Sequence, residues 1–117
     1  MVRPVVHFEI HGKDAKKLQE FYASLFGWKI DANNPMNYGM VEAGVGGPPD
    51  GIGGGVLQSD SAPMVTFYVQ VVDLNETLQK AESMGGQTVQ PPMDVPGGPT
   101  MAQFKDPEGN TIGLVKQ

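Results

Sequence analysis

The sequence predicts an α+β domain made of two tandem βαβββ modules. The main observation is an internal repeat, because three pairs of landmarks are each 59 positions apart: His7 and Thr66, Asp14 and Asp73, and Gly27 and Gly86. The 16 Gly and 10 Pro among 117 residues also favour many turns, and therefore short strands. Since this length accommodates one core rather than two, we expect a single domain, with module 1 at about residues 1–60 and module 2 at about 61–117.

The first module begins with a strand in which polar and apolar residues alternate. One face carries Val6, Phe8 and Ile10, and the opposite face carries His7, Glu9 and His11. A helix is then predicted between Asp14 as N-cap and Gly27 after its last residue. Its apolar positions have helical spacing and predict the buried side (Leu18, Phe21, Tyr22, Leu25 and Phe26). Further strands are predicted at 28–30, 38–42 and 52–58.

The second module repeats this order of elements. Residues 64–71 alternate like the first strand, and Asp73 with Glu76 forms a pattern typical of a helix N-terminus. Leu74, Leu78 and Ala81 predict the buried side of that helix, which we expect to end at Gly85 and Gly86. Strands follow at 87–90, 100–105 and 110–115, and the sequence of residues 106–109 is typical of a type I turn. In both modules the helices are expected to cover one face of the sheet.

Composition excludes several classes of function. The chain has no Cys, which excludes disulfides, thiolate metal ligands and cysteine nucleophiles. No apolar run approaches the roughly 20 residues of a membrane-spanning helix, and the N-terminus does not have the apolar core of a signal peptide. The net charge of −5 disfavours nucleic acid as a partner. We therefore expect a cytoplasmic protein that binds neither membrane nor nucleic acid.

Four segments carry a resemblance to a known family: His7–Ile10, Phe21–Trp28, Leu78–Gly86, and Asp106–Asn110 followed by Ile112–Val115. With the duplicated βαβββ order, they resemble the glyoxalase / bleomycin-resistance / extradiol dioxygenase (vicinal oxygen chelate) superfamily. The sequence is most similar to its small glyoxalase-like members, which are related to lactoylglutathione lyase. This resemblance implies curved mixed sheets that enclose a cavity, helices on the outer face, and a homodimer.

Many members of the superfamily bind a divalent metal, and the resemblance implies which positions of this chain would hold it. Their metal ligands are His, Glu, Gln or Asp side chains from the first and last strands of each module, and His7 matches the first of these positions. The others are not matched, because the fourth strand offers Gly51–Leu57, the fifth offers Thr66 and the last offers Gly113. We therefore expect no metal or other cofactor, with Zn, Ni, Fe or Mn as the alternative.

Without a metal, chemistry in the cavity would depend on acid–base groups. Glu9 and His7 are the candidate catalytic residues, because a carboxylate and an imidazole on one strand face can exchange protons with a ligand. The alternative is a polar pair that faces a solvated groove without catalysis. The predicted ligand-binding residues are His7, Glu9, Thr66, Tyr68, Gly113 and Gly54, the last because a glycine run within a strand leaves room for a ligand.

Three functions follow. The preferred one is a small organic molecule bound in the sheet cavity without the metal of the family, with or without catalysis. The second is a metal-dependent lyase, isomerase or dioxygenase of the same superfamily. The third is a non-catalytic resistance protein that sequesters a drug or metabolite. The chain has only eight Lys and Arg, which disfavours glutathione and CoA as ligands because both are anionic.

Overall fold

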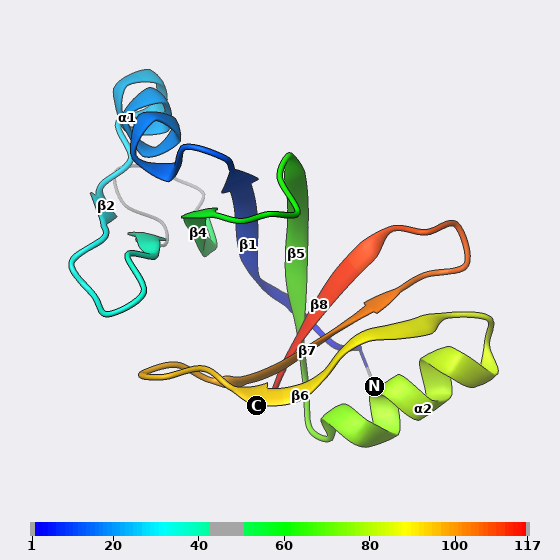
Figure 1. The fold of residues 1–117 in the computed structure, drawn as a ribbon. Coiled ribbons are helices and arrows are strands. Elements are labelled where there is room, and N and C mark those ends of the chain that lie inside the picture. Colours follow the sequence, from blue (N-terminus) through cyan, green and yellow to red (C-terminus); the bar gives the residue numbers. More distant parts are fainter. Residues whose placement is uncertain (1, 43–50, 117) are drawn as a thin grey trace. The chain divides into compact units, whose positions relative to one another are not determined.

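The computed structural model describes residues 2–42 and 51–116, and Figure 1 shows their fold. The described residues form ten elements in the order β1 (Val5–Gly12), α1 (Ala15–Phe26), β2 (Ile30–Asp31), β3 (Gly39–Val41), β4 (Gly53–Gln58), β5 (Met64–Val71), α2 (Leu74–Ser83), β6 (Gln87–Asp94), β7 (Thr100–Lys105) and β8 (Thr111–Lys116). This mixture confirms the α+β class. The chain divides into two compact units, which we call the N-terminal unit (His7–Val65) and the C-terminal unit (residues 2–6 and 66–116).

The N-terminal unit contains a sheet with the strand order β2-β3-β4-β1. β1 and β4 run parallel, with His7 opposite Gly53 and Glu9 opposite Gly55, and the other two pairings are antiparallel. α1 begins after Asp14, whose carboxylate accepts a hydrogen bond from the Lys17 amide. It ends at Gly27, where a φ of 70° favours glycine. The predicted helix boundaries are therefore confirmed.

The buried side of α1 differs from the prediction. Phe21, Leu25 and Phe26 are each more than half exposed in this chain. The helix instead contacts β4 through the side that carries Ala15 and Gln19, and the Gln19 side chain donates to the Val56 carbonyl oxygen (2.8 Å). A side chain at residue 39 would collide with Gln19, so Gly39 allows this contact. The buried side of α1 thus includes a polar contact that apolar spacing does not indicate, while Leu18 and Tyr22 of the predicted side are partly buried.

The C-terminal unit has the strand order β5-β8-β7-β6. β5 and β8 are parallel, and the other pairs are antiparallel. α2 begins after Asp73, whose side chain accepts from the Glu76 amide, but it ends at Ser83, two residues before the predicted glycines. β6 continues past the predicted end at residue 90 through Pro91 and Pro92 to Asp94, with register shifts against β7. A strand tolerates proline there because β6 has only one partner in this unit.

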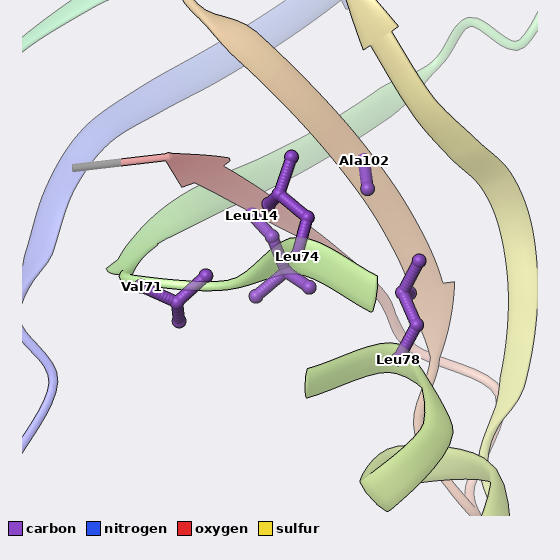
Figure 2. Close-up of a cluster of buried hydrophobic side chains, with 5 residues drawn as sticks. All are labelled: Val71, Leu74, Leu78, Ala102 and Leu114. Carbon is purple, nitrogen blue, oxygen red and sulfur yellow. The ribbon is translucent and has the colours of Figure 1, made fainter. Parts of the chain in front are cut away.

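The core of the C-terminal unit lies between α2 and β7–β8 (Figure 2). It is formed by Val71, Leu74, Leu78, Ala102 and Leu114. The two leucines of α2 come from its predicted apolar side, so this half of the repeat packs as its sequence pattern predicts. Neither helix in the described part of the chain is long and apolar enough to cross a membrane.

We expect Leu78→Ala to destabilise the protein by about 2–5 kcal/mol, because Leu78 is only 5% exposed and its loss leaves a cavity between α2 and the sheet. Urea unfolding followed by circular dichroism measures this change in the free energy of unfolding. The matched control is Gln79→Ala, at an exposed position of the same helix, which should change stability by less than about 0.5 kcal/mol. Equal effects of the two variants would contradict the assigned core.

Candidate functional site

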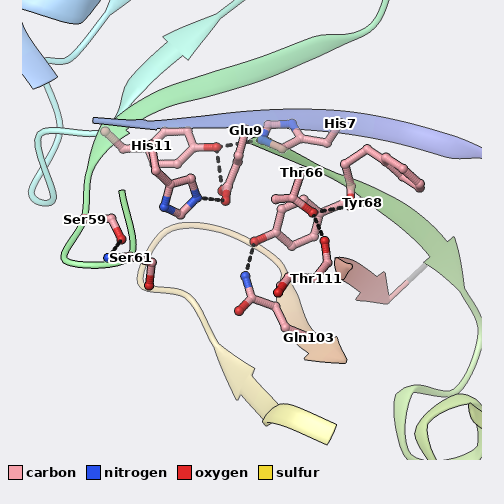
Figure 3. A network of polar contacts seen from close by, with 11 residues as sticks. His7, Glu9, His11, Ser59, Ser61, Thr66, Tyr68, Gln103 and Thr111 are labelled. Carbon is pink, nitrogen blue, oxygen red and sulfur yellow. Dashed lines mark hydrogen bonds and ion pairs between the residues drawn. The ribbon is translucent and has the colours of Figure 1, made fainter. Parts of the chain in front are cut away.

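The polar face of β1 carries a connected chain of four side chains within the N-terminal unit. His7 Nε2 lies 2.7 Å from Tyr38 Oη, and Tyr38 Oη donates to Glu9 Oε2 at 2.9 Å. The other carboxylate oxygen, Glu9 Oε1, lies 3.0 Å from His11 Nε2. Figure 3 shows His7, Glu9 and His11 along the same strand, with dashed lines for these contacts. The predicted grouping of His7 with Glu9 therefore includes two further residues.

The direction of these hydrogen bonds follows from the number of hydrogens available. A phenol has one hydrogen, which Tyr38 donates to Glu9, so its oxygen accepts from His7 Nε2–H. The carboxylate of Glu9 only accepts, so His11 Nε2 also carries a hydrogen. Every donor among these four hydrogen-bonded side chains thus points toward Glu9. The neutral His7 imidazole has its hydrogen on Nε2.

His11 and Glu9 form the buried end of this chain. His11 is 8% exposed and Glu9 is 9% exposed, whereas His7 and Tyr38 are only partly buried. His11 Nδ1 is buried and has no hydrogen-bond partner among the described residues. A ligand on this face would therefore meet His7 and Tyr38 before it could reach Glu9.

Tyr38 is held in place by the loop between β2 and β3. The Asn34 side chain contacts the Tyr38 backbone twice, because Asn34 Oδ1 accepts from the Tyr38 amide (2.9 Å) and Asn34 Nδ2 donates to the Tyr38 carbonyl oxygen (2.6 Å). Asn37 turns the chain just before Tyr38 with a φ of 50°, a left-handed conformation that Asn tolerates. The loop thus fixes the position of the ring before any ligand binds.

The glycine run of β4 gives the ring its space. A Cβ on Gly55 would overlap the ring and the hydroxyl oxygen of Tyr38, so any larger residue would displace the ring. Gly54, which we predicted to contact a ligand, lies opposite Phe8, and a Cβ there would meet the Phe8 ring. Since alternate residues of a strand face opposite sides, Gly54 faces away from His7 and Glu9. Gly53 and Gly55, which lie opposite His7 and Glu9, are on the same side as those two residues.

The remaining predicted ligand-binding residues form a second cluster, in the C-terminal unit. Thr66 donates its hydroxyl hydrogen to the Thr111 carbonyl oxygen at 2.7 Å. Tyr68 lies opposite Gly113, its ring fills the space that a side chain at 113 would need, and its Oη accepts from Gln103 Nε2 at 3.0 Å. Thr66 and Tyr68 are both buried. The structure therefore brings Thr66, Tyr68 and Gly113 together with Gln103, which the sequence analysis did not single out.

The electrostatics of the first cluster centre on His7. Burial lowers the pKa of His7 below its ordinary value, and the carboxylate of Glu9 opposes this change by favouring the imidazolium. Burial is the larger of the two effects. At neutral pH this lowered pKa favours the neutral imidazole, and the contact with Tyr38 places its hydrogen on Nε2.

The donor set does not fit the divalent metal that the family resemblance implies. His7 Nε2 is bound to Tyr38, the Thr66 hydroxyl is bound to a backbone carbonyl, and Gly113 has no side chain. Gln58, the nearest amide in the fourth strand, is exposed and lies opposite Gly12 at the end of β4. Across residues 2–42 and 51–116, no group of three or more His, Asp or Glu is arranged to hold a metal ion.

Surface hollows occur elsewhere. One of about 470 Å³ is lined by residues of the C-terminal unit, among them Arg3, Asp73 and Lys80. Another, of about 310 Å³, lies beside the start of α1 and is lined by Gly12, Leu18 and Phe21. None of the predicted site residues lines either hollow. The polar chain on β1 is therefore the stronger candidate, because its side chains can exchange protons.

The chain belongs to the Glyoxalase/Bleomycin resistance protein/Dioxygenase superfamily, which it matches over residues 5–114. This match confirms the resemblance that the sequence motifs indicate. Among curated proteins, the chain is similar to "Putative glyoxylase CFP32" of Mycobacterium bovis and of Mycobacterium tuberculosis, with 28% identity over 117 residues and 91% of this chain covered. It spans 42% of the length of these relatives.

Solved structures share the fold. A methylmalonyl-CoA epimerase from Streptomyces coelicolor has a TM-score of 0.69 at 16% identity, covering 100% of this chain and 96% of that chain. The 2,2',3-trihydroxybiphenyl 1,2-dioxygenase from Sphingomonas wittichii strain RW1 has a TM-score of 0.64 at 16% identity, covering 100% of this chain and 41% of that chain. At these identities the likeness shows the fold alone, and one fold can support many reactions.

Local sequence patterns do not identify Tyr38 as a site residue. Tyr38 lies in a predicted strand, and its contact with Glu9 spans 29 positions, which strand periodicity cannot reveal. One signal was present, because Gly53, Gly54 and Gly55 indicate close approach of another group to the strand. That signal points to the ring of Tyr38 at Gly55 and of Phe8 at Gly54.

We expect Gly55→Ala to push the Tyr38 ring away from Glu9, because the added Cβ would overlap it. Overpacking of this kind costs about 1–3 kcal/mol, which urea unfolding measures. Gly51→Ala is the matched control, since a Cβ at residue 51 meets no atom of the described chain within 4 Å. A Gly55→Ala protein as stable as Gly51→Ala would contradict the placement of Tyr38.

We expect His7 to titrate below its ordinary pKa of about 6.5, and Glu9→Gln to lower the pKa of His7 further by removing the charge that favours the imidazolium. In the wild type, the lowered pKa means that the unfolded chain binds more protons at His7 than the folded chain does. The free energy of unfolding should therefore fall as the pH drops from about 6.5 toward the pKa of His7 in the folded protein. NMR titration of the His7 Cε1–H signal measures the pKa values. A His7 pKa above the ordinary value, or one that Glu9→Gln leaves unchanged, would count against this electrostatic account.

Proposed function

We propose that this chain binds a small organic molecule against the polar face of β1 in the N-terminal unit, and that binding requires no divalent metal. We further propose that His7 and Glu9 exchange a proton with that molecule. The observation that carries the proposal is the hydrogen-bonded chain from His7 through Tyr38 to Glu9, because it joins a partly exposed imidazole to a buried carboxylate. General acid–base catalysis commonly uses such titratable groups.

The cost of burying these groups supports a functional role. A buried carboxylate needs donors on its oxygens, and Glu9 has Tyr38 on one and His11 on the other. His11, however, leaves its Nδ1 buried without a hydrogen-bond partner among the described residues, which costs about 1–3 kcal/mol. An apolar pair at positions 9 and 11 would avoid that cost, so a polar chain retained there is better explained by its chemistry than by stability.

Charge indicates which ligands this face would accept. The chain has a net charge of −5, and the Glu9 carboxylate is the charged group that acts on His7. An anionic ligand would meet repulsion from both, so a neutral or cationic molecule is favoured. The methylmalonyl-CoA epimerase with the same fold does not indicate a CoA ester as the ligand here, because its likeness to this chain concerns the fold alone.

The proposal is tested first by metal content and then by ligand binding. Mass spectrometry of protein purified without chelator, then offered Zn, Ni, Fe and Mn, should find far less than one ion per chain, with no difference between wild type and His7→Ala. A stoichiometric ion that His7→Ala loses would show that the metal-dependent alternative is correct. The same samples in a sedimentation experiment test the homodimer that we also propose.

For binding, we expect size-matched neutral and cationic fragments, benzamide and benzamidine, to shift the His7 NMR signals more strongly than the anion benzoate. In isothermal titration calorimetry, His7→Ala should weaken binding of the better fragment about tenfold, since it removes a hydrogen-bonding group from the face. Gln79→Ala, at an exposed position of α2, is the control and should leave the affinity unchanged. Stronger binding of benzoate, or fragment binding that His7→Ala leaves intact, would overturn the proposed site.

A further inference from the structure

We propose that Tyr38 carries protons between His7 and Glu9, so that the buried carboxylate can exchange a proton with a ligand through the phenol and the imidazole. The part of this inference that concerns a ligand rests on the proposed function. The relay itself is a property of the free protein. It assigns a role to Tyr38, a residue that strand periodicity does not single out.

The geometry places the phenol oxygen between the two titratable groups. Tyr38 Oη lies 2.7 Å from His7 Nε2 and 2.9 Å from Glu9 Oε2, and both distances are those of well-formed hydrogen bonds. The phenol is the right kind of group for this position, because it donates and accepts through one atom. Phenylalanine would have the same ring but would interrupt the chain.

The proton transfer balances without any other reactant. As the ligand loses a proton, its bond to hydrogen breaks, its electron pair stays on the ligand, and the His7 imidazole gains the proton at Nδ1. The His7 Nε2–H proton then passes to Tyr38 Oη, and the Tyr38 hydroxyl proton passes to Glu9 Oε2. His7 and Tyr38 end neutral, Glu9 becomes a neutral carboxylic acid, and the ligand carries the negative charge that Glu9 has lost. The reverse sequence returns the proton.

Neighbouring residues hold both ends of the relay in position. His11 occupies Glu9 Oε1, which leaves Oε2 for Tyr38, and Asn34 fixes the Tyr38 backbone through two hydrogen bonds. Gly55 gives the ring its space. Because these contacts exist without a ligand, the transfer needs little rearrangement, which is the feature that makes a preorganised site effective.

The relay makes a prediction that a merely structural hydrogen-bond network does not. If Glu9 gains a proton, the chain should reverse: Glu9 donates to Tyr38, Tyr38 donates to His7 Nε2, and the His7 hydrogen moves to Nδ1. Glu9→Gln imitates the protonated state. With the His11 hydrogen on Nε2, as in the wild type, the Gln amide oxygen faces His11, and the amide nitrogen faces Tyr38 and donates to it.

The experiment is ¹⁵N NMR of the histidine side chains in ligand-free protein at about pH 8, where the lowered pKa of His7 keeps its imidazole neutral. The chain has two His, so a His7→Gln sample identifies the His11 signals by exclusion. Wild type should show His7 with hydrogen on Nε2. Glu9→Gln should show mainly the Nδ1–H form, and Glu9→Gln with Tyr38→Phe should not, because the connection is broken.

The matched control is Glu9→Gln with Tyr22→Phe, which removes the hydroxyl of a tyrosine in α1 that stacks on Phe26 and Trp28 and should leave the tautomer change intact. An unchanged His7 tautomer in Glu9→Gln would overturn the relay, and so would a change that persists without the Tyr38 hydroxyl. If the double variant does not fold, the comparison of wild type with Glu9→Gln still decides. The tautomer change can occur even if the fragments do not bind at His7, and the fragments can bind without the tautomer change. The two proposals are therefore tested independently.

Discussion

The candidate site depends on one steric constraint, which is the contact of the Tyr38 ring with the bare backbone of Gly55. Without that space the phenol oxygen could not reach both His7 Nε2 and Glu9 Oε2 from its loop. The same device recurs in this chain, because the Phe8 ring lies over Gly54 and the Tyr68 ring over Gly113. Glycines within the strands are therefore not weak points of the sheet here. Gly54, Gly55 and Gly113 each provide the space for a particular aromatic ring.

Local patterns in the sequence predict the local structure well. Alternation places His7, Glu9 and His11 on one face of β1, and the Asp14 and Gly27 signals mark the ends of α1, because each depends only on neighbouring residues. What the sequence could not predict are contacts between distant segments. Tyr38 reaches Glu9 across 29 positions, and Gln19 turns α1 toward β4 across 37. Both contacts are polar and depend on a glycine, so apolar spacing alone gives no sign of them.

The repeat also shows how one pattern supports different chemistry in its two copies. The 59-residue offset matches His7 with Thr66 and Glu9 with Tyr68. In the C-terminal unit the Thr66 hydroxyl is bound to the backbone carbonyl oxygen of Thr111, and Tyr68 Oη accepts from the uncharged amide of Gln103. In the N-terminal unit the corresponding positions carry an imidazole and a carboxylate, which can gain or lose a proton near neutral pH or below it.

This difference explains why the N-terminal unit is the better candidate for chemistry. A threonine hydroxyl and a glutamine amide can orient a ligand, but neither changes its protonation state under ordinary conditions. His7 and Glu9 can, and Tyr38 joins them through a single oxygen atom. A duplicated fold needs only one copy to keep titratable groups, while the other can satisfy its buried polar atoms internally and contribute stability. In the repeat, the acid–base groups therefore differ at the positions of His7 and Glu9, which are Thr66 and Tyr68 in the second copy.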